Sequence, residues 1–262
     1  FTTSTLVSGL VVLFTIGVLS AYTVRSVMVG RTNERRVARE GGSAFVGLWV
    51  MEAFYWSFRA PGRICSKLGI HPDVLTWISL VLSIGTLPAA AMGHFSICGA
   101  LLIVGAIFDA LDGMVARELK VASDSGEMLD AVVDRYADAA PLIGLAVFYR
   151  FSIWQMAIPI AALMGSMMVS YVRAKTEALG LKLPSGLMRR HERIAYISFA
   201  LVVAPELSGW LGQPAGAVHS GTLAVVGLVA IVSNFAAYRL VSAARTELIK
   251  QGRGPKGASG EK

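Results

Sequence analysis

Four aspartates are the residues of this sequence whose type and spacing point most directly to chemistry. Residues 109–134 read DALDGMVARELKVASDSGEMLDAVVD, which places Asp109 and Asp112 three residues apart and Asp130 and Asp134 four residues apart. Residues three or four apart lie on one face of an α-helix. A short turn between the two helices would make them antiparallel neighbours, so we expect the four carboxylates to converge.

Four carboxylates close together among apolar residues need positive charge nearby. The flanking residues are mostly apolar, and one Asp at membrane depth costs about 2.5–3.5 kcal/mol. Oxygen ligands suit a hard cation such as Mg²⁺ or Mn²⁺, and a two-ion site suits phosphoryl transfer, in which charge builds on two oxygens. We therefore predict two such ions, bound by Asp109, Asp112, Asp130 and Asp134. The plainer alternative is ion pairing of helix-end acids with Arg117, Arg135 and Lys120, which would not require this spacing.

The same segment resembles the signature of a known family. The pattern Asp109-x2-Asp112-Gly113-x2-Ala116-Arg117-x8-Gly126-x3-Asp130-x3-Asp134 matches the motif of CDP-alcohol phosphotransferases at every defined position. The resemblance implies transfer of a lipid phosphate from a cytidine nucleotide to an alcohol. It implies that Asp134 holds metal or acts as the base that deprotonates the acceptor hydroxyl. It also implies that the CDP group contacts Asp112, Gly113, Ala116, Arg117, Gly126 and Thr76.

Two later stretches bear on the acceptor alcohol. Residues 170–180 (SYVRAKTEALG) and 185–194 (SGLMRRHERI) resemble the phosphatidylinositol-phosphate synthase branch of that family. Arg190 and Arg193 would begin a helix, where the helix dipole disfavours cations, so a bound phosphate would stabilise them. We expect an acceptor phosphate to contact Arg173, Lys175, Arg190, Arg193 and Arg239. The sequence departs from the branch at Asp73, Thr176, Arg189 and His191.

The resulting prediction is an enzyme that moves a phosphatidyl group from CDP-diacylglycerol, or a similar CDP-linked lipid, to inositol 1-phosphate, with release of CMP. The same chemistry with glycerol 3-phosphate, then with serine or inositol, is the alternative. Alternatively, the basic residues of the predicted acceptor site only set the orientation of the chain in the membrane and form ion pairs with Glu177 and Glu192. A non-catalytic ion-binding or transport protein is an alternative of another class, but inverted repeats or broken helices, which many transporters have, are not evident.

The surrounding elements are predicted to be membrane helices. The 262 residues are 55% hydrophobic and 16% charged, with a mean hydropathy of +0.61, which is too apolar for a soluble domain. A membrane span needs about 20 apolar residues. Predicted spans are residues 6–29, 74–92, 95–115, 127–149, 153–172, a fifth core span from 194, and 221–241. Residues 44–58, interrupted by Glu52, are shorter, and we expect an amphipathic helix in the membrane interface.

Charge distribution predicts the orientation. The net charge of +7 comes from basic residues between the apolar segments and at the C-terminus, as the positive-inside rule requires. We therefore expect the acids on the cytoplasmic side of the plasma membrane, and no nucleic-acid partner. The predicted parts are an added N-terminal helix (1–30), a basic linker with the interfacial helix (31–67), a six-helix core (68–245) and a disordered tail (246–262). The family resemblance also implies a homodimer.

Overall fold

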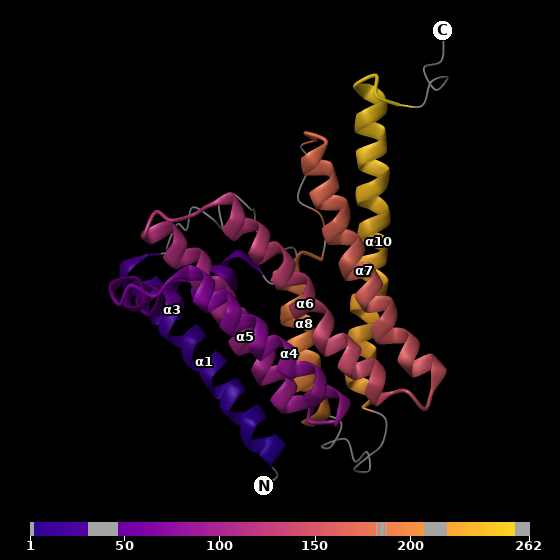
Figure 1. The fold of residues 1–262 in the computed structure, drawn as a ribbon. Helices are drawn as coiled ribbons and strands as arrows, with labels where there is room; N and C mark the ends of the chain where they lie inside the picture. Colours follow the sequence, from indigo (N-terminus) through magenta and orange to yellow (C-terminus); the bar gives the residue numbers. More distant parts are fainter. Residues whose placement is uncertain are drawn as a thin grey trace.

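The protein is almost wholly α-helical. The computed structural model describes residues 3–30, 47–181, 183, 186, 188–206 and 219–254, and none of these lies in a β-strand. The main helices, shown in Figure 1, are α1 (Thr3–Val29), α3 (Gly47–Lys67), α4 (Pro72–Ala91), α5 (Phe95–Glu118), α6 (Asp124–Phe148), α7 (Ile153–Ala178), α8 (Arg190–Val202) and α10 (Ser220–Lys250). The all-α prediction is confirmed. The basic stretch predicted as a linker, residues 31–42, lies outside the described residues.

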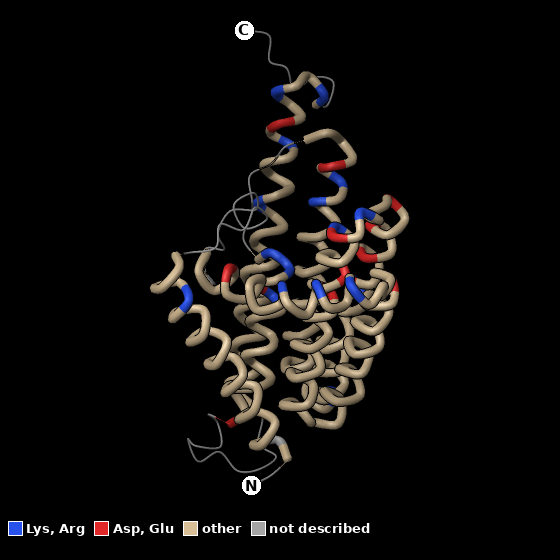
Figure 2. The backbone as a smooth tube through the Cα atoms, turned by 90° about the vertical axis from the view of Figure 1, so that its left-hand side faces the viewer, with Lys and Arg blue, Asp and Glu red and all other residues tan. Residues whose placement is uncertain are grey.

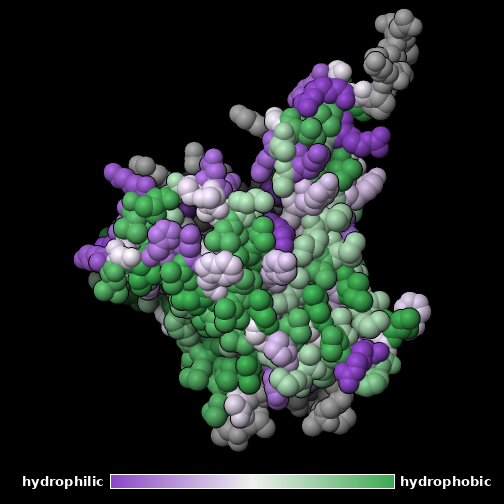
Figure 3. All heavy atoms as spheres, in the orientation of Figure 1, coloured by the Kyte–Doolittle hydropathy of each residue, from purple (hydrophilic) through white to green (hydrophobic). Residues whose placement is uncertain are grey.

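The outer surface of the helices suits a lipid environment. Five of the described helices, α1, α4, α5, α7 and α10, are long and apolar enough to cross a membrane. Large apolar side chains such as Leu13, Val81 and Ile231 are 67%, 69% and 72% exposed on them. Figure 3 shows a broad hydrophobic surface over the body of the molecule, with hydrophilic residues gathered mainly at one end. The protein is therefore an integral membrane protein.

Five of the seven predicted spans correspond to described helices that are long and apolar enough to cross a membrane, and two do not. α6 contains the acids and is less apolar, and the described part of α8 is only 13 residues long. Neither is among the helices that are apolar and long enough to span by themselves. The six-helix core with one added N-terminal span therefore stays a prediction.

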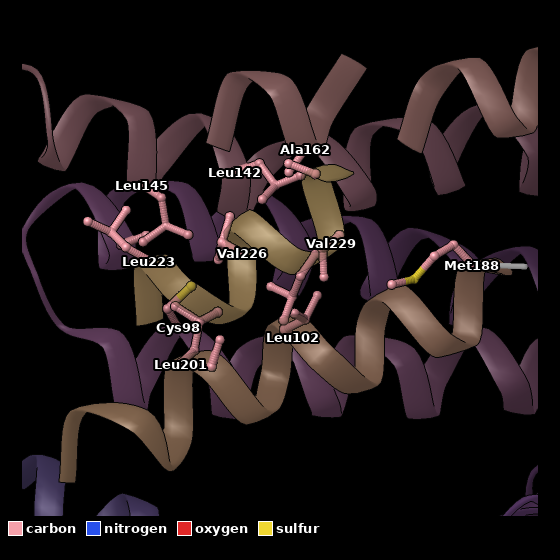
Figure 4. Packing of buried hydrophobic residues seen from close by; sticks show 14 of the residues in the cluster. Cys98, Leu102, Leu142, Leu145, Ala162, Met188, Leu201, Leu223, Val226 and Val229 are labelled. Carbon is pink, nitrogen blue, oxygen red and sulfur yellow. The ribbon is translucent and has the colours of Figure 1, made fainter. Parts of the chain in front are cut away.

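One buried apolar core joins α4, α5, α6, α7, α8 and α10. Figure 4 shows part of it, where Cys98 and Leu102 of α5 meet Leu201 of α8 and Val226 of α10. α4 packs along both α5 and α6, whereas α5 and α6 touch each other little. The prediction that α5 and α6 are direct antiparallel neighbours is therefore wrong for most of their length. Their close approach is confined to the end that carries the acids.

Close packing between α4 and α6 depends on a glycine. A Cβ atom at Gly144 would lie 2.5 Å from the carbonyl oxygen of Leu87, which is much shorter than a van der Waals contact between carbon and oxygen. Small residues at such positions allow membrane helices to approach closely. Gly144 therefore fixes how α6 lies against α4, and with it the position of the acids that α6 carries.

α3 is longer than the predicted interfacial helix. It was expected to end at Phe58, but it continues through Pro61 to Lys67. A proline inside a helix removes one backbone hydrogen bond. Packing compensates for that loss, because Phe58 belongs to a buried cluster with Leu111 and Val115 of α5. Residues 44–46 of the predicted helix lie outside the described part of the chain.

The added N-terminal helix is attached to the bundle by a buried contact to α3. The Tyr22 hydroxyl of α1 donates a hydrogen bond to Oε2 of Glu52, at 3.0 Å. The Tyr22 ring is completely buried and lies 5.6 Å, centroid to centroid, from the rings of both Trp49 and Trp56. α3 in turn packs on the end of α5 that carries Leu111 and Val115. α1 and α3 thus support α5 from one side.

Several helix ends differ from the predicted boundaries. α6 starts at Asp124 because Ser123 is its N-cap, whose Oγ accepts a hydrogen bond from the Gly126 amide at 3.2 Å. α7 continues past Val172 to Ala178, and α10 continues to Lys250, so a disordered tail cannot begin at residue 246. These two helices pack against each other and extend together beyond the rest of the bundle in Figure 1. Residues 255–262 lie outside the described part.

Charged residues are distributed unevenly along the bundle. In Figure 2 most Lys, Arg, Asp and Glu residues lie toward the end where α10 finishes, and the opposite half is almost free of colour. Apolar residues therefore form the membrane-embedded half of the bundle. The last turns of α5 and the first turns of α6, which carry the acids, lie at the charged end.

Candidate active site

The turn between α5 and α6 places the acids. After α5 ends, Lys120 adopts a left-handed backbone conformation with φ 57°, and the Val121 amide donates to the carbonyl of Ala116 at 3.0 Å. These features reverse the chain within a few residues, and the Ser123 cap then starts α6. As a result the C-terminal turns of α5 and the N-terminal turns of α6 face each other.

Three of the four predicted metal ligands form one compact group. Asp109, Asp130 and Asp134 each offer a carboxylate oxygen, and these oxygens lie within 4.8 Å of one another. The side chains of Asp109 and Asp134 are only 17% and 14% exposed. The donor set consists of oxygens alone, which fits the ligand preference of Mg²⁺ and Mn²⁺. The residues present therefore fit a divalent cation.

Asp112, the fourth acid, is held in a different way. Its Oδ2 accepts a hydrogen bond from the hydroxyl of Thr76 in α4 at 2.6 Å, and the two side chains are 6% and 5% exposed. Asp112 is not part of the compact group of three. Thr76, predicted to contact the CDP group, therefore orients an acid of the site. This contact also fixes α4 to the acid-bearing end of α5.

Arg190 lies inside the acid cluster. This first residue of α8 places Nη1 2.7 Å from Oδ2 of Asp109 and Nη2 2.8 Å from Oδ1 of Asp134. Its Nε lies 3.4 Å from Oδ1 of Asp138. The planar guanidinium group suits such multiple contacts with carboxylates. A residue predicted to bind the acceptor phosphate therefore directly contacts two of the predicted metal ligands.

Behind this cluster lies a second, fully buried ion pair. Nη2 of Arg193 is 2.7 Å from Oδ2 of Asp138, and the two residues are 2% and 7% exposed. Nη1 of Arg193 donates to the carbonyl of Met188 at 2.8 Å. The Ser170 hydroxyl of α7 accepts from Arg193 at 3.3 Å and from Arg135 at 2.7 Å. Side chains from α6, α7 and α8 are therefore joined in one network.

The remaining residues predicted to contact CDP lie on the α5–α6 side of the site. The guanidinium of Arg117 lies over Gly113, where a Cβ atom would be only 3.1 Å from Nη1 of Arg117. Arg117 is exposed at the end of α5, while Ala116 and Gly126 are half-buried. Gly113 thus allows the Arg117 side chain to fold back along the helix toward the acids.

The other predicted acceptor residues lie outside the ion-pair network. Arg173 of α7 is half-buried, and its Nη2 has no hydrogen-bond partner. Lys175 of α7 and Arg239 of α10 are exposed. The structure therefore brings Arg190 to the acid group and Arg193 to Asp138 behind it, whereas Arg173, Lys175 and Arg239 stay predicted ligands without a described contact to the acids.

Asp138 and Ser170 belong to the site but were not among the predicted site residues. Asp138 follows Asp134 by four residues, so helical periodicity places both on one face of α6. Ser170 opens the 170–180 stretch that suggested the acceptor type. Helical periodicity predicts that Asp138 extends the face of Asp130 and Asp134 and orients Arg135 or an inner polar group, and the 3.8 Å contact of Arg135 with Asp138 agrees. The contact between Arg193 and Ser170 joins α8 to α7, so it needs the tertiary structure.

Comparison with known proteins identifies the family. The family model described as CDP-alcohol phosphatidyltransferase matches residues 69–232, more than half of the chain. The chain belongs to the CDP-alcohol phosphatidyltransferase family. Archaetidylinositol phosphate synthase of Pyrococcus horikoshii is 36% identical over 140 residues, which are 53% of this chain and 73% of that protein. Phosphatidylinositol phosphate synthase of Cutibacterium acnes is 37% identical over 152 residues, 53% of this chain and 68% of that protein.

Solved structures support the same assignment. Phosphatidylinositol phosphate synthase PgsA1 of Mycobacterium tuberculosis, with CDP-DAG bound, matches with a TM-score of 0.62 and 26% identity, over 78% of this chain and 96% of that chain. A complex of the same protein with manganese and citrate matches with a TM-score of 0.62 and 25% identity, over 78% of this chain and 92% of that chain. This CDP-alcohol phosphatidyltransferase is therefore a metal-dependent membrane enzyme of phospholipid biosynthesis.

Proposed function

We propose that this enzyme transfers the phosphatidyl group of CDP-diacylglycerol to inositol 1-phosphate, with phosphatidylinositol phosphate and CMP as products. The observation that carries the proposal is the contact of Arg190 with Asp109 and Asp134. Arg190 comes from one of the two stretches that suggested a phosphorylated acceptor, and an arginine is suited to bind phosphate. Its position beside the acids supports an acceptor phosphate bound next to them. The phosphatidylinositol phosphate synthases among the relatives agree with this choice.

The acids have two roles in the proposed reaction. Asp109, Asp112, Asp130 and Asp134 would hold Mg²⁺ or Mn²⁺, for which we propose two ions, and when bound these ions would neutralise the diphosphate of the CDP-linked lipid. Asp112 is oriented for this by Thr76. Gly113, Ala116, Arg117 and Gly126 would lie along the CDP group, where the small residues leave room and Arg117 donates to a phosphate oxygen.

The reaction balances as a direct displacement. Asp134 takes the proton of the acceptor hydroxyl, and the resulting oxygen forms a bond to the β-phosphorus on the lipid side. The bond from that phosphorus to the bridging oxygen breaks, and CMP leaves with the electron pair. Asp134 is our candidate for the proton transfer because it belongs to the acid group and also contacts Arg190, so it lies beside both the proposed cations and the proposed acceptor phosphate. No covalent enzyme intermediate is needed.

The acceptor phosphate would be bound by basic residues around Arg190. Arg173 is the best supported of these, because it is half-buried and its Nη2 has no hydrogen-bond partner. Lys175 and Arg239 complete the proposed set, and Arg193 supports it from behind. We also propose that the enzyme lies in the plasma membrane with this site facing the cytoplasm, and that it forms a homodimer.

The test is CMP release from CDP-diacylglycerol by the purified full-length enzyme with Mn²⁺ or Mg²⁺. Inositol 1-phosphate, glycerol 3-phosphate, serine and inositol are compared as acceptors, and we expect the highest kcat/KM with inositol 1-phosphate. Release with glycerol 3-phosphate alone would refute the acceptor assignment. Asp134→Asn should abolish turnover in the same assay, and a variant with a near-normal rate would refute the role of Asp134 as base.

A further inference from the structure

Arg190 and the predicted metal site use the same carboxylates. Asp109 and Asp134, which Arg190 contacts at 2.7 and 2.8 Å, are two of the three acids whose oxygens lie within 4.8 Å of one another. A guanidinium group and a divalent cation are both positive, and each is stabilised at this position by the negative charge of the same two carboxylates. Binding of a cation by Asp109 and Asp134 is therefore opposed by the contacts that Arg190 makes to the same two acids.

The third contact of Arg190 is of a different kind. Asp138, which accepts from Nε, is not part of the compact acid group. Its other oxygen is fixed by Arg193, which is itself buried and held by the carbonyl of Met188. Asp138 is therefore a rigid anchor, and it holds Arg190 at Nε, the guanidinium nitrogen nearest the backbone. Rotation about the side-chain bonds before Nε can swing the planar guanidinium as a whole, so that its terminal nitrogens leave the acids while Nε stays beside Asp138.

We propose that Arg190 and a divalent cation compete for Asp109 and Asp134, and that Asp138 retains Arg190 beside the site when the cation binds. The cation then releases Nη1 and Nη2, the two groups that can donate a bidentate pair of hydrogen bonds to a phosphate. Binding of the cation thus prepares the site for the phosphorylated acceptor, so the cation binds first. This last step rests on the proposed function, whereas the competition does not.

The competition is tested by Mn²⁺ binding to the full-length enzyme in detergent, without substrate, from the electron paramagnetic resonance signal of free Mn²⁺. Arg190→Gln should bind Mn²⁺ about tenfold more tightly than the wild type, because the cation no longer displaces a charge-assisted hydrogen bond to Asp109 and an ion pair with Asp134. Arg190→Lys should lie between the two, because an ammonium group is a single point charge that cannot contact both acids through a rigid fork.

Arg135→Gln is the matched control. It removes the same charge from α6, next to Asp134, but Arg135 contacts Ser170 and Asp138 instead of the acid group. General electrostatics alone should therefore tighten Mn²⁺ binding in this variant by no more than about threefold. Equal effects of Arg190→Gln and Arg135→Gln would overturn the competition, whichever acceptor the enzyme uses.

The anchoring role of Asp138 is tested separately by kinetics. Asp138→Asn should raise the KM for inositol 1-phosphate at least about fivefold, by loss of one charged contact to Arg190, while the KM for CDP-diacylglycerol stays the same. Thr222→Val is the control, because it removes a buried hydrogen bond of similar kind, to the carbonyl of Ala200, away from the acids and from Arg190. It should leave both KM values within about twofold of the wild type. An unchanged acceptor KM in Asp138→Asn, or equal changes of the two KM values, would overturn the anchor.

Discussion

Replacement of Thr76 tests whether a residue of α4 controls the acid site on α5. Its hydroxyl donates to Oδ2 of Asp112 at 2.6 Å, and both side chains are almost completely buried. Thr76→Val keeps the shape of the side chain but removes the donor. A hydrogen bond to a charged group contributes about 1.5–3 kcal/mol, and every 1.4 kcal/mol is about a tenfold change. We therefore expect kcat/KM for CDP-diacylglycerol to fall by about 10- to 150-fold.

The assay is CMP release at saturating acceptor, with CDP-diacylglycerol varied in mixed micelles. Thr76→Ser is the matched control, because it retains the hydroxyl and loses only a methyl group, so it should stay within about threefold of the wild type. The KM for the acceptor should not change in either variant, because Asp112 has no contact with Arg190. Equal losses in Thr76→Val and Thr76→Ser would refute the reasoning, since packing and not the hydrogen bond would then be responsible.

Three further predictions concern the contact of α1 with α3, the packing of α6 on α4 and the cation requirement of the acid group. Tyr22→Phe removes the donor to Glu52 and should lower unfolding stability by about 1–3 kcal/mol without a change in kcat, measured by thermal denaturation and by CMP release; an unchanged melting temperature would contradict a stabilising role of this contact. Gly144→Ala forces α6 away from Leu87, and we expect a loss of about 1–3 kcal/mol in the same denaturation assay, whereas Gly9→Ala, with open space around it, should be neutral. Treatment with EDTA should abolish CMP release, and Mn²⁺ should restore it; activity that survives EDTA would contradict the cation requirement.

Local patterns in the sequence were sufficient for much of the fold. Continuous apolar stretches predicted the spanning helices, and the spacing of the four aspartates predicted a convergent acid group, which Asp109, Asp130 and Asp134 form without Asp112. Helix ends were less predictable. α3 continues through Pro61 because Phe58 packs on α5, and α7 and α10 continue past their apolar parts because they support each other. Contacts of this kind join residues far apart in the chain, so no local pattern contains them.

Contacts within the site likewise could not be predicted from local sequence patterns. The spacing of the acids suggested that α5 and α6 are neighbours, yet α4 lies between them and contributes Thr76 to the site. Likewise, Arg190 and Arg193 were both expected to meet a phosphate. Arg190 is half-buried and lies on the acid cluster, whereas Arg193, three positions further along α8, is 2% exposed and lies behind it. The packing of α8 determines how deeply each arginine is buried. As a result Arg190 contacts the acid group, and Arg193 contacts Asp138 behind it.

Asp138 contacts both Arg190 and Arg193. One of its oxygens holds the buried Arg193, and the other holds Arg190. Removal of one partner from a buried ion pair is far more costly than the pair is stabilising, so Arg193 and Asp138 depend on each other. We infer that this pair fixes the position of the Asp138 carboxylate, which can then hold Arg190 at Nε. Such an anchor allows Arg190 to change its terminal contacts and still remain at the site where cation, lipid phosphate and acceptor would meet.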